Sequence, residues 1–201
     1  MSNELVRQGY NIIATKYTGY RNQFKSIKYL EKLNNLLKPD STILDIGCGS
    51  GEPIDKFFID RGHRVIGIDS SEKQIELARK NVPQARYIIK DMSELVEGEY
   101  QVDAVVSFYA IFHIPRENHQ ELFQMISSFL PEEGWILVSM GSSEGEGTED
   151  DFLGVKMYWS RYGAEKNRNI IESAGFKVIL DEIDTSAGER HQIILAHKGI
   201  K

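Results

Sequence analysis

The feature of this sequence that most constrains its fold is a strict alternation of short β-branched runs with helical patterns from Ser41 onward. The apolar runs are short, rich in Val and Ile and bounded by turn residues, which is typical of buried strands. The segments between them repeat apolar residues three and four positions apart, as amphipathic helices do. Such alternation predicts an α/β fold, with a parallel sheet covered by helices on both faces. The predicted strands are 42–47, 64–69, 85–90, 102–108 and 134–140.

The two ends of the chain depart from this alternation. After a helix that contains Ile170 and Ile171, the runs 176–184 and 190–198 are separated only by TSAGE. This spacing predicts a hairpin, so that the last strand runs antiparallel to the others. Two helical faces precede the sheet, and their apolar residues are Tyr10, Ile13 and Tyr17, then Phe24, Ile27, Leu30, Leu33 and Leu37.

We expect a single domain, because no linker and no internal repeat interrupts these patterns. Its predicted parts are an N-terminal helical cap over 1–38, a core over 41–140, an acidic loop with an aromatic segment over 141–165, and a final helix with a hairpin over 166–201.

A glycine-rich loop follows the first predicted strand, in the stretch ILDIGCGSGEP from Ile43 to Pro53. Glycine allows the main chain to turn sharply and to approach a ligand closely. In a βα unit, such a loop lies at the carboxyl end of the sheet. Asp45 precedes the glycines and Glu52 follows them, so two carboxylates stand where a phosphate would be repelled. The loop therefore favours a ligand with a cationic part.

Acidic residues also end the next two predicted strands. Asp69 ends VIGID at roughly the 20-residue spacing at which an acid accepts hydrogen bonds from ribose hydroxyls. Asp91 follows the third strand, where it could accept from an adenine amino group. Asp69 could instead cap the next helix, but Ser71 and Gln74 already form a capping box that leaves Asp69 available. For Gln74 itself, capping and ligand contact both remain open.

Four segments of the chain resemble the class I S-adenosylmethionine-dependent methyltransferases in their order and spacing: ILDIGCGSG, VIGIDSSEKQIELAR, IIKDMSEL and VDAVVSFYAIFHI. The resemblance covers about residues 42–114 and implies a Rossmann-like, doubly wound, mostly parallel seven-stranded sheet with an antiparallel last strand. It implies methyltransferase activity with S-adenosylmethionine as the cofactor. The residues that it assigns to cofactor binding are Asp45, Gly47, Gly49, Asp69, Ser70, Gln74, Asp91, Met92, Ser107 and Phe108.

The resemblance also assigns roles within the site. Asp45 and the glycines would contact the methionine end of the cofactor, and Asp69 the ribose. Asp91 with the Met92 backbone would meet the adenine. Ser107 and Phe108 would lie near the reacting methyl group.

Methyl transfer from a sulfonium depends on aligning the acceptor and excluding water, and it needs a base only where the acceptor must lose a proton. The candidate catalytic residues are His113 and Tyr109, just past the fourth predicted strand. For His113, the alternative is a packing role among its apolar neighbours. His119, on the helix that follows Pro115, is expected to be solvated.

The sequence favours a small-molecule acceptor. The residues after the fourth strand are SFYA, so the Asp/Asn-Pro-Pro-aromatic motif of family members that methylate nucleic-acid amines is absent, and so is a Pro-Cys pair. A net charge of −6 without a basic stripe argues against a nucleic-acid partner. No apolar run approaches the roughly 20 residues of a membrane span, so no membrane partner is expected.

Residues outside the cofactor motifs are predicted to form the acceptor pocket. These are Tyr10 and Tyr17 on the first helix, and Trp159 and Arg161 in the aromatic segment. The acidic stretch from Gly141 to Asp151 could be a solvated loop or a lid that attracts a cation, whereas Arg161 could hold an acidic group. These two signals leave the charge of the acceptor open.

Cys48 is the single cysteine, so we expect neither a disulfide framework nor a metal site, and a packing role for this thiol. The N-terminus lacks the apolar segment of a secretion signal, which favours a cytoplasmic location. Two alternative functions remain: a non-catalytic protein that binds S-adenosylmethionine as a regulator, and a nicotinamide-dependent reductase.

Overall fold

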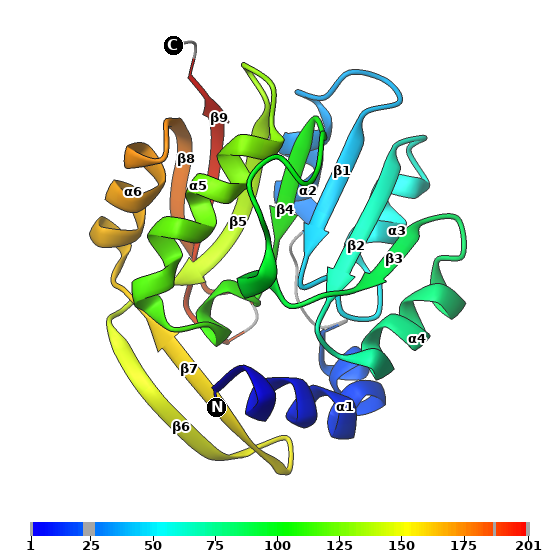
Figure 1. The fold of residues 1–201 in the computed structure, drawn as a ribbon, viewed down its shortest axis with the longest axis vertical. Coiled ribbons are helices and arrows are strands. Elements are labelled where there is room, and N and C mark those ends of the chain that lie inside the picture. Colours follow the sequence, from blue (N-terminus) through cyan, green and yellow to red (C-terminus); the bar gives the residue numbers. More distant parts are fainter. Residues whose placement is uncertain (1, 22–26, 187, 200–201) are drawn as a thin grey trace.

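The computed structural model of the chain describes residues 2–21, 27–186 and 188–199. Its main sheet has seven strands in the order β3-β2-β1-β4-β5-β9-β8, and β9 runs antiparallel to both of its neighbours. This confirms the predicted sheet (Figure 1). The strands are β1 Thr42–Ile46, β2 Arg64–Asp69, β3 Arg86–Ile89, β4 Ala104–Ser107, β5 Trp135–Gly141, β8 Phe176–Asp184 and β9 His191–Lys198.

Helices cover both faces of the sheet, as the alternation predicts. α2, α3 and α4 pack on one face, and α5 and α6 pack on the other. Phe24, which we expected on the second helical face, lies outside the described residues. The helices are α1 Ser2–Arg21, α2 Ile27–Asn34, α3 Ile54–Ile59, α4 Glu72–Asn81, α5 His119–Phe129 and α6 Ala164–Ser173, with 3₁₀ turns at Met92–Glu94, Ile111–His113 and Arg116–Asn118.

Local chemistry sets the ends of several helices. α4 begins where the Ser71 hydroxyl accepts a hydrogen bond from the Gln74 N–H at 3.2 Å. Past the ends of α3 and α6, Gly62 and Gly175 adopt φ values of +84° and +94°, a region that favours glycine.

The strand register brings the site residues to one edge of the sheet. In the parallel ladders, Asp45 of β1 lies opposite Gly67 of β2 and Val106 of β4. The loops that leave the carboxyl ends of these strands therefore start at nearly the same height. α1 crosses below these strand ends (Figure 1).

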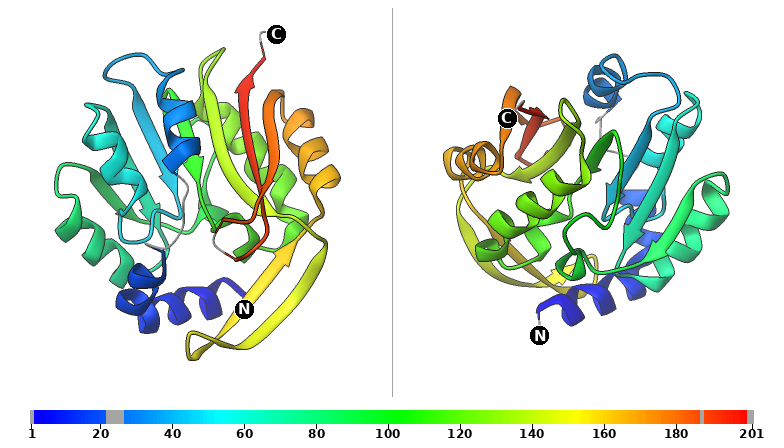
Figure 2. Two further views of the ribbon diagram at one scale, coloured as in Figure 1. Left: turned by 180° about the vertical axis from the view of Figure 1, so that it is seen from behind. Right: turned by 45° about the horizontal axis from the view of Figure 1, so that its top comes forward.

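The segment predicted as an acidic loop is instead a β-hairpin, separate from the main sheet. β6 Gly145–Phe152 pairs antiparallel with β7 Val155–Arg161. Most of β6 is exposed, whereas Met157 of β7 is fully buried against Val6 and Ile13 of α1. The prediction of a loop was wrong. Most of β6 is exposed, and an exposed strand that is held by its pairing with β7 needs no apolar residues of its own. Figure 2 shows the hairpin and α1 together at one end of the molecule.

Candidate active site

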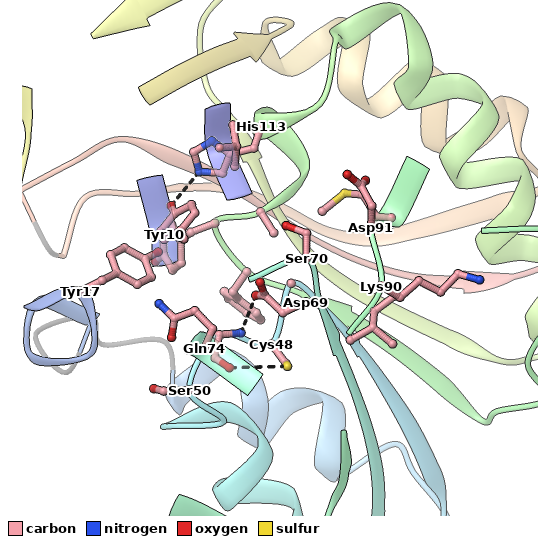
Figure 3. Close-up of a pocket in the computed structure, with 18 of the residues that line it drawn as sticks. Tyr10, Tyr17, Cys48, Ser50, Asp69, Ser70, Gln74, Lys90, Asp91 and His113 are labelled. Carbon is pink, nitrogen blue, oxygen red and sulfur yellow. Dashed lines mark hydrogen bonds between the residues drawn. The ribbon is translucent and has the colours of Figure 1, made fainter. Parts of the chain in front are cut away.

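A cavity opens at the carboxyl ends of β1, β2, β3 and β4. The glycine loop, the residues after β2 and β3, and one face of α1 form its walls, as Figure 3 shows. Most of the residues predicted to bind the cofactor line this cavity. They are Gly47, Gly49, Asp69, Ser70, Gln74, Asp91, Met92 and Phe108.

The glycine loop adopts backbone conformations that other residues disfavour. Gly47 and Gly49 have φ values of +76° and +54°. A Cβ atom at Gly47 would lie 2.2 Å from the Cβ of Ala110, so any larger side chain would clash. The loop thus brings bare main chain to the floor of the cavity.

Asp69 holds the loop in place and also faces the cavity. One carboxylate oxygen accepts from the Gly49 N–H at 2.9 Å, and the other accepts from the Ser71 N–H at 2.8 Å. Burial raises the pKa of Asp69 to about 6. The capping box at Ser71 and Gln74 suggested that Asp69 was available for a ligand, but its carboxylate already accepts two hydrogen bonds from the main chain. Each oxygen still has a second lone pair for a ligand.

Gln74 is a buried polar residue of the cavity wall. Its residue is 1% exposed, and neither its amide oxygen nor its amide nitrogen has a hydrogen-bond partner among the described residues. Its side chain does not complete a capping box, because the Ser71 N–H donates to Asp69. Unpartnered buried amides are costly, so this geometry favours ligand contact over capping.

Asp91 lies at the rim beneath the third strand. Its carboxylate accepts from the N–H and the hydroxyl of Ser93, at 2.9 and 2.8 Å, and so caps the short turn that carries Met92. Asp91, Asp69 and Gln74 share the cavity from three different elements.

Two residues predicted to contact the cofactor, Ser107 and Asp45, are buried and are not among the described residues that line the cavity. Ser107 is fully buried and donates to the Ile46 carbonyl at 2.7 Å, which ties β4 to β1. Asp45 lies beside the carboxyl group of Asp55. Burial and the neighbouring acid raise the pKa of Asp45, and burial raises the pKa of Asp55 to about 7. These side chains support the loop from behind.

His113 forms a hydrogen-bonded chain between α1 and the hairpin. Its Nδ1 lies 2.9 Å from the Tyr158 carbonyl and its Nε2 lies 2.8 Å from the Tyr10 hydroxyl. A carbonyl can only accept, so Nδ1 carries the proton and Nε2 accepts from Tyr10. Burial lowers the pKa of His113 to about 4, which keeps the ring neutral. His113 and Tyr10 both line the cavity.

Tyr109 and His119 follow β4 in the chain and differ in their surroundings. Tyr109 lines the cavity with a φ of +59°, and its N–H donates to the Ser139 hydroxyl at 2.6 Å. His119 is 1% exposed and packs edge-on against Tyr162, so the expectation that it is solvated was wrong. It is the first residue of α5, and the turns that precede α5 fold over it.

Sequence reasoning missed Arg21, which ends α1 and lines the same cavity. Its guanidinium carbon lies 3.9 Å from the centre of the Tyr109 ring. The spacing held a usable signal, because Tyr10, Tyr17 and Arg21 are seven and four residues apart and so share one face of a helix.

Trp159 and Arg161 line a second cavity, between the hairpin and the ends of β5 and β9. Of the four residues predicted for the acceptor pocket, Tyr10 and Tyr17 line the first cavity and the other two line the second.

The chain is similar to known methyltransferases. The family model described as "Methyltransferase domain" matches residues 43–134. An uncharacterized methyltransferase of Oceanobacillus iheyensis is 22% identical over 142 residues, which cover 71% of this chain and 59% of that protein. The chain therefore matches less than two thirds of this curated relative.

Solved structures share the fold. A S-adenosylmethionine-dependent methyltransferase of Methanosarcina mazei has a TM-score of 0.73 at 20% identity, over 84% of this chain and 97% of that chain. The 1,6-didemethyltoxoflavin-N1-methyltransferase of Burkholderia thailandensis, bound to its substrate and S-adenosylhomocysteine, has a TM-score of 0.74 at 17% identity, over 96% and 87%.

Residues 43–134 match a methyltransferase domain, and the chain has the fold of S-adenosylmethionine-dependent methyltransferases. One of these neighbours holds S-adenosylhomocysteine, the product of this cofactor. The cavity suits this cofactor, because a buried unpartnered amide, a buried carboxylate and glycine backbone meet where an adenosyl group needs donors and acceptors. Arg21 also lines this cavity. No described helix of this chain is both long and apolar enough to cross a membrane.

Proposed function

We propose that this chain transfers the methyl group of S-adenosylmethionine to a small-molecule acceptor by in-line attack on the methyl carbon. The observation that carries the proposal is the continuity of the lining: Tyr10, Tyr17 and Tyr109 line the cofactor cavity and also a narrower space beyond it. Phe112 and Trp159 line both that space and the second cavity.

The residues of the chain would divide the work as follows. Asp69 would accept from the ribose hydroxyls, Gln74 and Asp91 would contact the adenine, and Arg21 would hold the methionine carboxylate. The bound cofactor would supply an activated methyl group on a sulfonium. The tyrosines of α1 would exclude water and orient the acceptor, which is the main requirement of this chemistry.

Of the two candidate bases, His113 and Tyr109, His113 is not set up to take a proton from the acceptor. The Nε2 of His113 is occupied by the Tyr10 hydroxyl. Burial raises the pKa of Tyr10 well above its usual range. We therefore infer that His113 and Tyr10 position α1 over the site, and that the acceptor reaches it with a lone pair already available.

Two features support a small acceptor: the rings that line the narrow space beyond the cofactor cavity, and the net charge of the chain. The passage beyond the cofactor cavity is walled almost entirely by rings. The chain has 30 acidic and 24 basic residues, which does not favour a phosphate backbone.

The test is a calorimetric titration of the protein with S-adenosylhomocysteine and with NAD, followed by S-adenosylhomocysteine formation with a panel of small acceptors. We expect tight binding of the adenosyl ligand, no binding of NAD, and turnover with at least one acceptor. Tight binding of NAD alone would refute the methyltransferase assignment. Adenosyl binding without turnover across oxygen, nitrogen, sulfur and carbon acceptors would favour the regulatory alternative.

A further inference from the structure

The space between the two cavities has an unusual lining. Its described wall consists of seven aromatic rings and one carboxylate, which we call the aromatic box. Its residues are Tyr10, Tyr17, Tyr20, Tyr109, Phe112, Phe152, Trp159 and Glu189.

The rings of the box contact one another at different angles. Phe152 lies edge-on to Trp159 with 5.1 Å between ring centres, and 6.2 Å from Tyr17. Tyr10 and Tyr17 are 4.8 Å apart. The rings come from α1, the turn after β4 and the hairpin, so the box forms only where these three elements meet.

Glu189 supplies the one carboxylate. One of its oxygens accepts from the Tyr20 hydroxyl at 2.6 Å, and the other accepts from His191 Nε2 at 2.7 Å. The hydrogen bond from His191 lowers the pKa of Glu189, so the group is charged at neutral pH. Both oxygens keep a lone pair, and the side chain is 42% exposed.

Arginines of the described chain lie near the box. Arg190 lines the outer cavity beside Glu189, and the charge of Arg21 helps to lower the pKa of Glu189. Arg161 lines the outer cavity, its Nε donates to the Ser143 carbonyl at 3.1 Å, and its methylenes pack on Gly141. Arg21 covers one face of Tyr109 from the cofactor side. Within the described lining of the box, the formal charge is that of Glu189.

We propose that the aromatic box surrounds the amine nitrogen of the methyl acceptor and stabilises the alkylammonium that methylation forms there, so that the acceptor is an aliphatic amine. Faces of aromatic rings attract cations, and rings combined with a carboxylate are suited to methylated ammonium groups. This inference rests on the proposed function and narrows its acceptor class.

The reaction gives the box a role beyond binding. An amine free base, having left its proton in the solvent, attacks the methyl carbon with its nitrogen lone pair. The carbon–sulfur bond breaks and its electron pair goes to sulfur, which becomes the neutral thioether. The nitrogen gains a methyl group and a positive charge. Because this charge grows in the transition state, π faces and a carboxylate around the nitrogen lower the barrier.

The binding test compares three probes of nearly equal shape in the presence of saturating S-adenosylhomocysteine: choline, the neutral 3,3-dimethylbutan-1-ol and the anion 3,3-dimethylbutanoate. By calorimetry, we expect choline to bind roughly 10-fold more tightly than the alcohol, and the anion to bind least. Equal affinities, a preference for the anion, or no choline binding at millimolar concentrations would each overturn the proposal.

Substitutions in the aromatic box then test whether choline binds there. Glu189→Gln should weaken choline about 5- to 30-fold and leave S-adenosylhomocysteine affinity unchanged, and Phe152→Leu should weaken choline without removing a charge. Glu97→Gln is the matched control, because Glu97 is exposed and lies outside the box. If Glu97→Gln and Glu189→Gln had equal effects, the box would not be the site. If the unmodified protein did not bind S-adenosylhomocysteine, the proposed function itself would be refuted.

Discussion

At the scale of single residues, the site depends on buried polar groups whose surroundings set their protonation. Asp69 and Asp55 are acids held in low-polarity surroundings, whereas His113 and His119 are bases held neutral. Burial disfavours the charged form in every case, so acids and bases shift in opposite directions. Their effects on stability should therefore have opposite dependences on pH.

Asp69→Asn should weaken S-adenosylhomocysteine binding by about 10- to 100-fold, because hydrogen bonds to a charged acceptor contribute roughly 1.5–3 kcal/mol. The amide should also lower the melting temperature slightly, since its NH₂ group cannot accept from both Gly49 and Ser71. Calorimetric titration measures the first effect and thermal unfolding the second. Asp60→Asn, on the exposed end of α3, is the control. Unchanged affinity in Asp69→Asn would contradict the ribose role.

His119→Phe should flatten the dependence of stability on pH. The pKa of His119 is lowered to about 4 in the folded state, so the unfolded chain binds more protons between about pH 4 and 6.5. Stability from this group is complete above pH 6.5 and is lost as the pH falls. Between pH 7 and 5, the unmodified protein should lose about 2 kcal/mol more than the variant. Urea unfolding at several pH values measures this, and free energies of unfolding that change equally with pH in the two proteins would contradict the prediction.

Asp55→Asn should have the opposite dependence. The pKa of Asp55 is raised to about 7, so the folded state holds the extra proton and stability falls as the pH rises from about 4 to 7. Near pH 4 the two proteins should be similarly stable. At pH 8 the variant should be more stable, by on the order of 1–3 kcal/mol, because an amide can donate to Asp45. Urea unfolding at both pH values checks this, with Asp60→Asn as control, and a less stable variant at pH 8 would contradict it.

At the scale of elements, α1 and the β6–β7 hairpin form a cover that neither could form alone. β7 carries the Tyr158 carbonyl that holds His113, and α1 carries Tyr10, which holds the other side of the same ring. Met157 is fully buried in the cluster with Val6 and Ile13. The imidazole thus ties both elements to the turn after β4, and the small apolar cluster joins the two elements to each other.

Met157→Ala should destabilise the protein by about 2–4 kcal/mol, as expected when a buried side chain leaves a cavity. It should also weaken S-adenosylhomocysteine binding, because the α1 face above Met157 lines the cofactor cavity. Lys156→Ala, the exposed neighbour on the same strand, should change neither property appreciably. Urea unfolding and calorimetry give both values. If Met157→Ala lost stability but kept full affinity, α1 would not shape the cofactor site through β7.

At the scale of the whole molecule, the charge of the surface bears on the class of acceptor. The formal net charge is −6, and the cavities open between α1, the hairpin and the strand ends, where acids from β6 are exposed. A nucleic acid would have to approach a chain of net negative charge.

We expect no binding of single-stranded RNA or duplex DNA at low salt and micromolar protein, measured by fluorescence anisotropy. The same sample should bind S-adenosylhomocysteine, which verifies its fold. Salt-sensitive binding of either nucleic acid would contradict a small-molecule acceptor.

The sequence by itself determined the order of the main elements, the parallel sheet with its reversed last strand, and most of the cofactor cavity. These follow from local rules: β-branched runs and helical spacing depend on near neighbours, and parallel strands bring their carboxyl ends to one edge. Gly47, Gly49, Asp69 and Asp91 were therefore predictable as a group.

Only the tertiary structure decided which side chains face the cavity and what covers it. Asp45 and Ser107 lie behind the wall, because their direction depends on strand pleat and on the partners across the sheet. The hairpin has no apolar alternation on its acidic strand. Glu189 lies near the end of the chain and Tyr20 near its start, so no local pattern joins them. Contacts between distant segments are set by packing, and packing is a property of the folded chain as a whole.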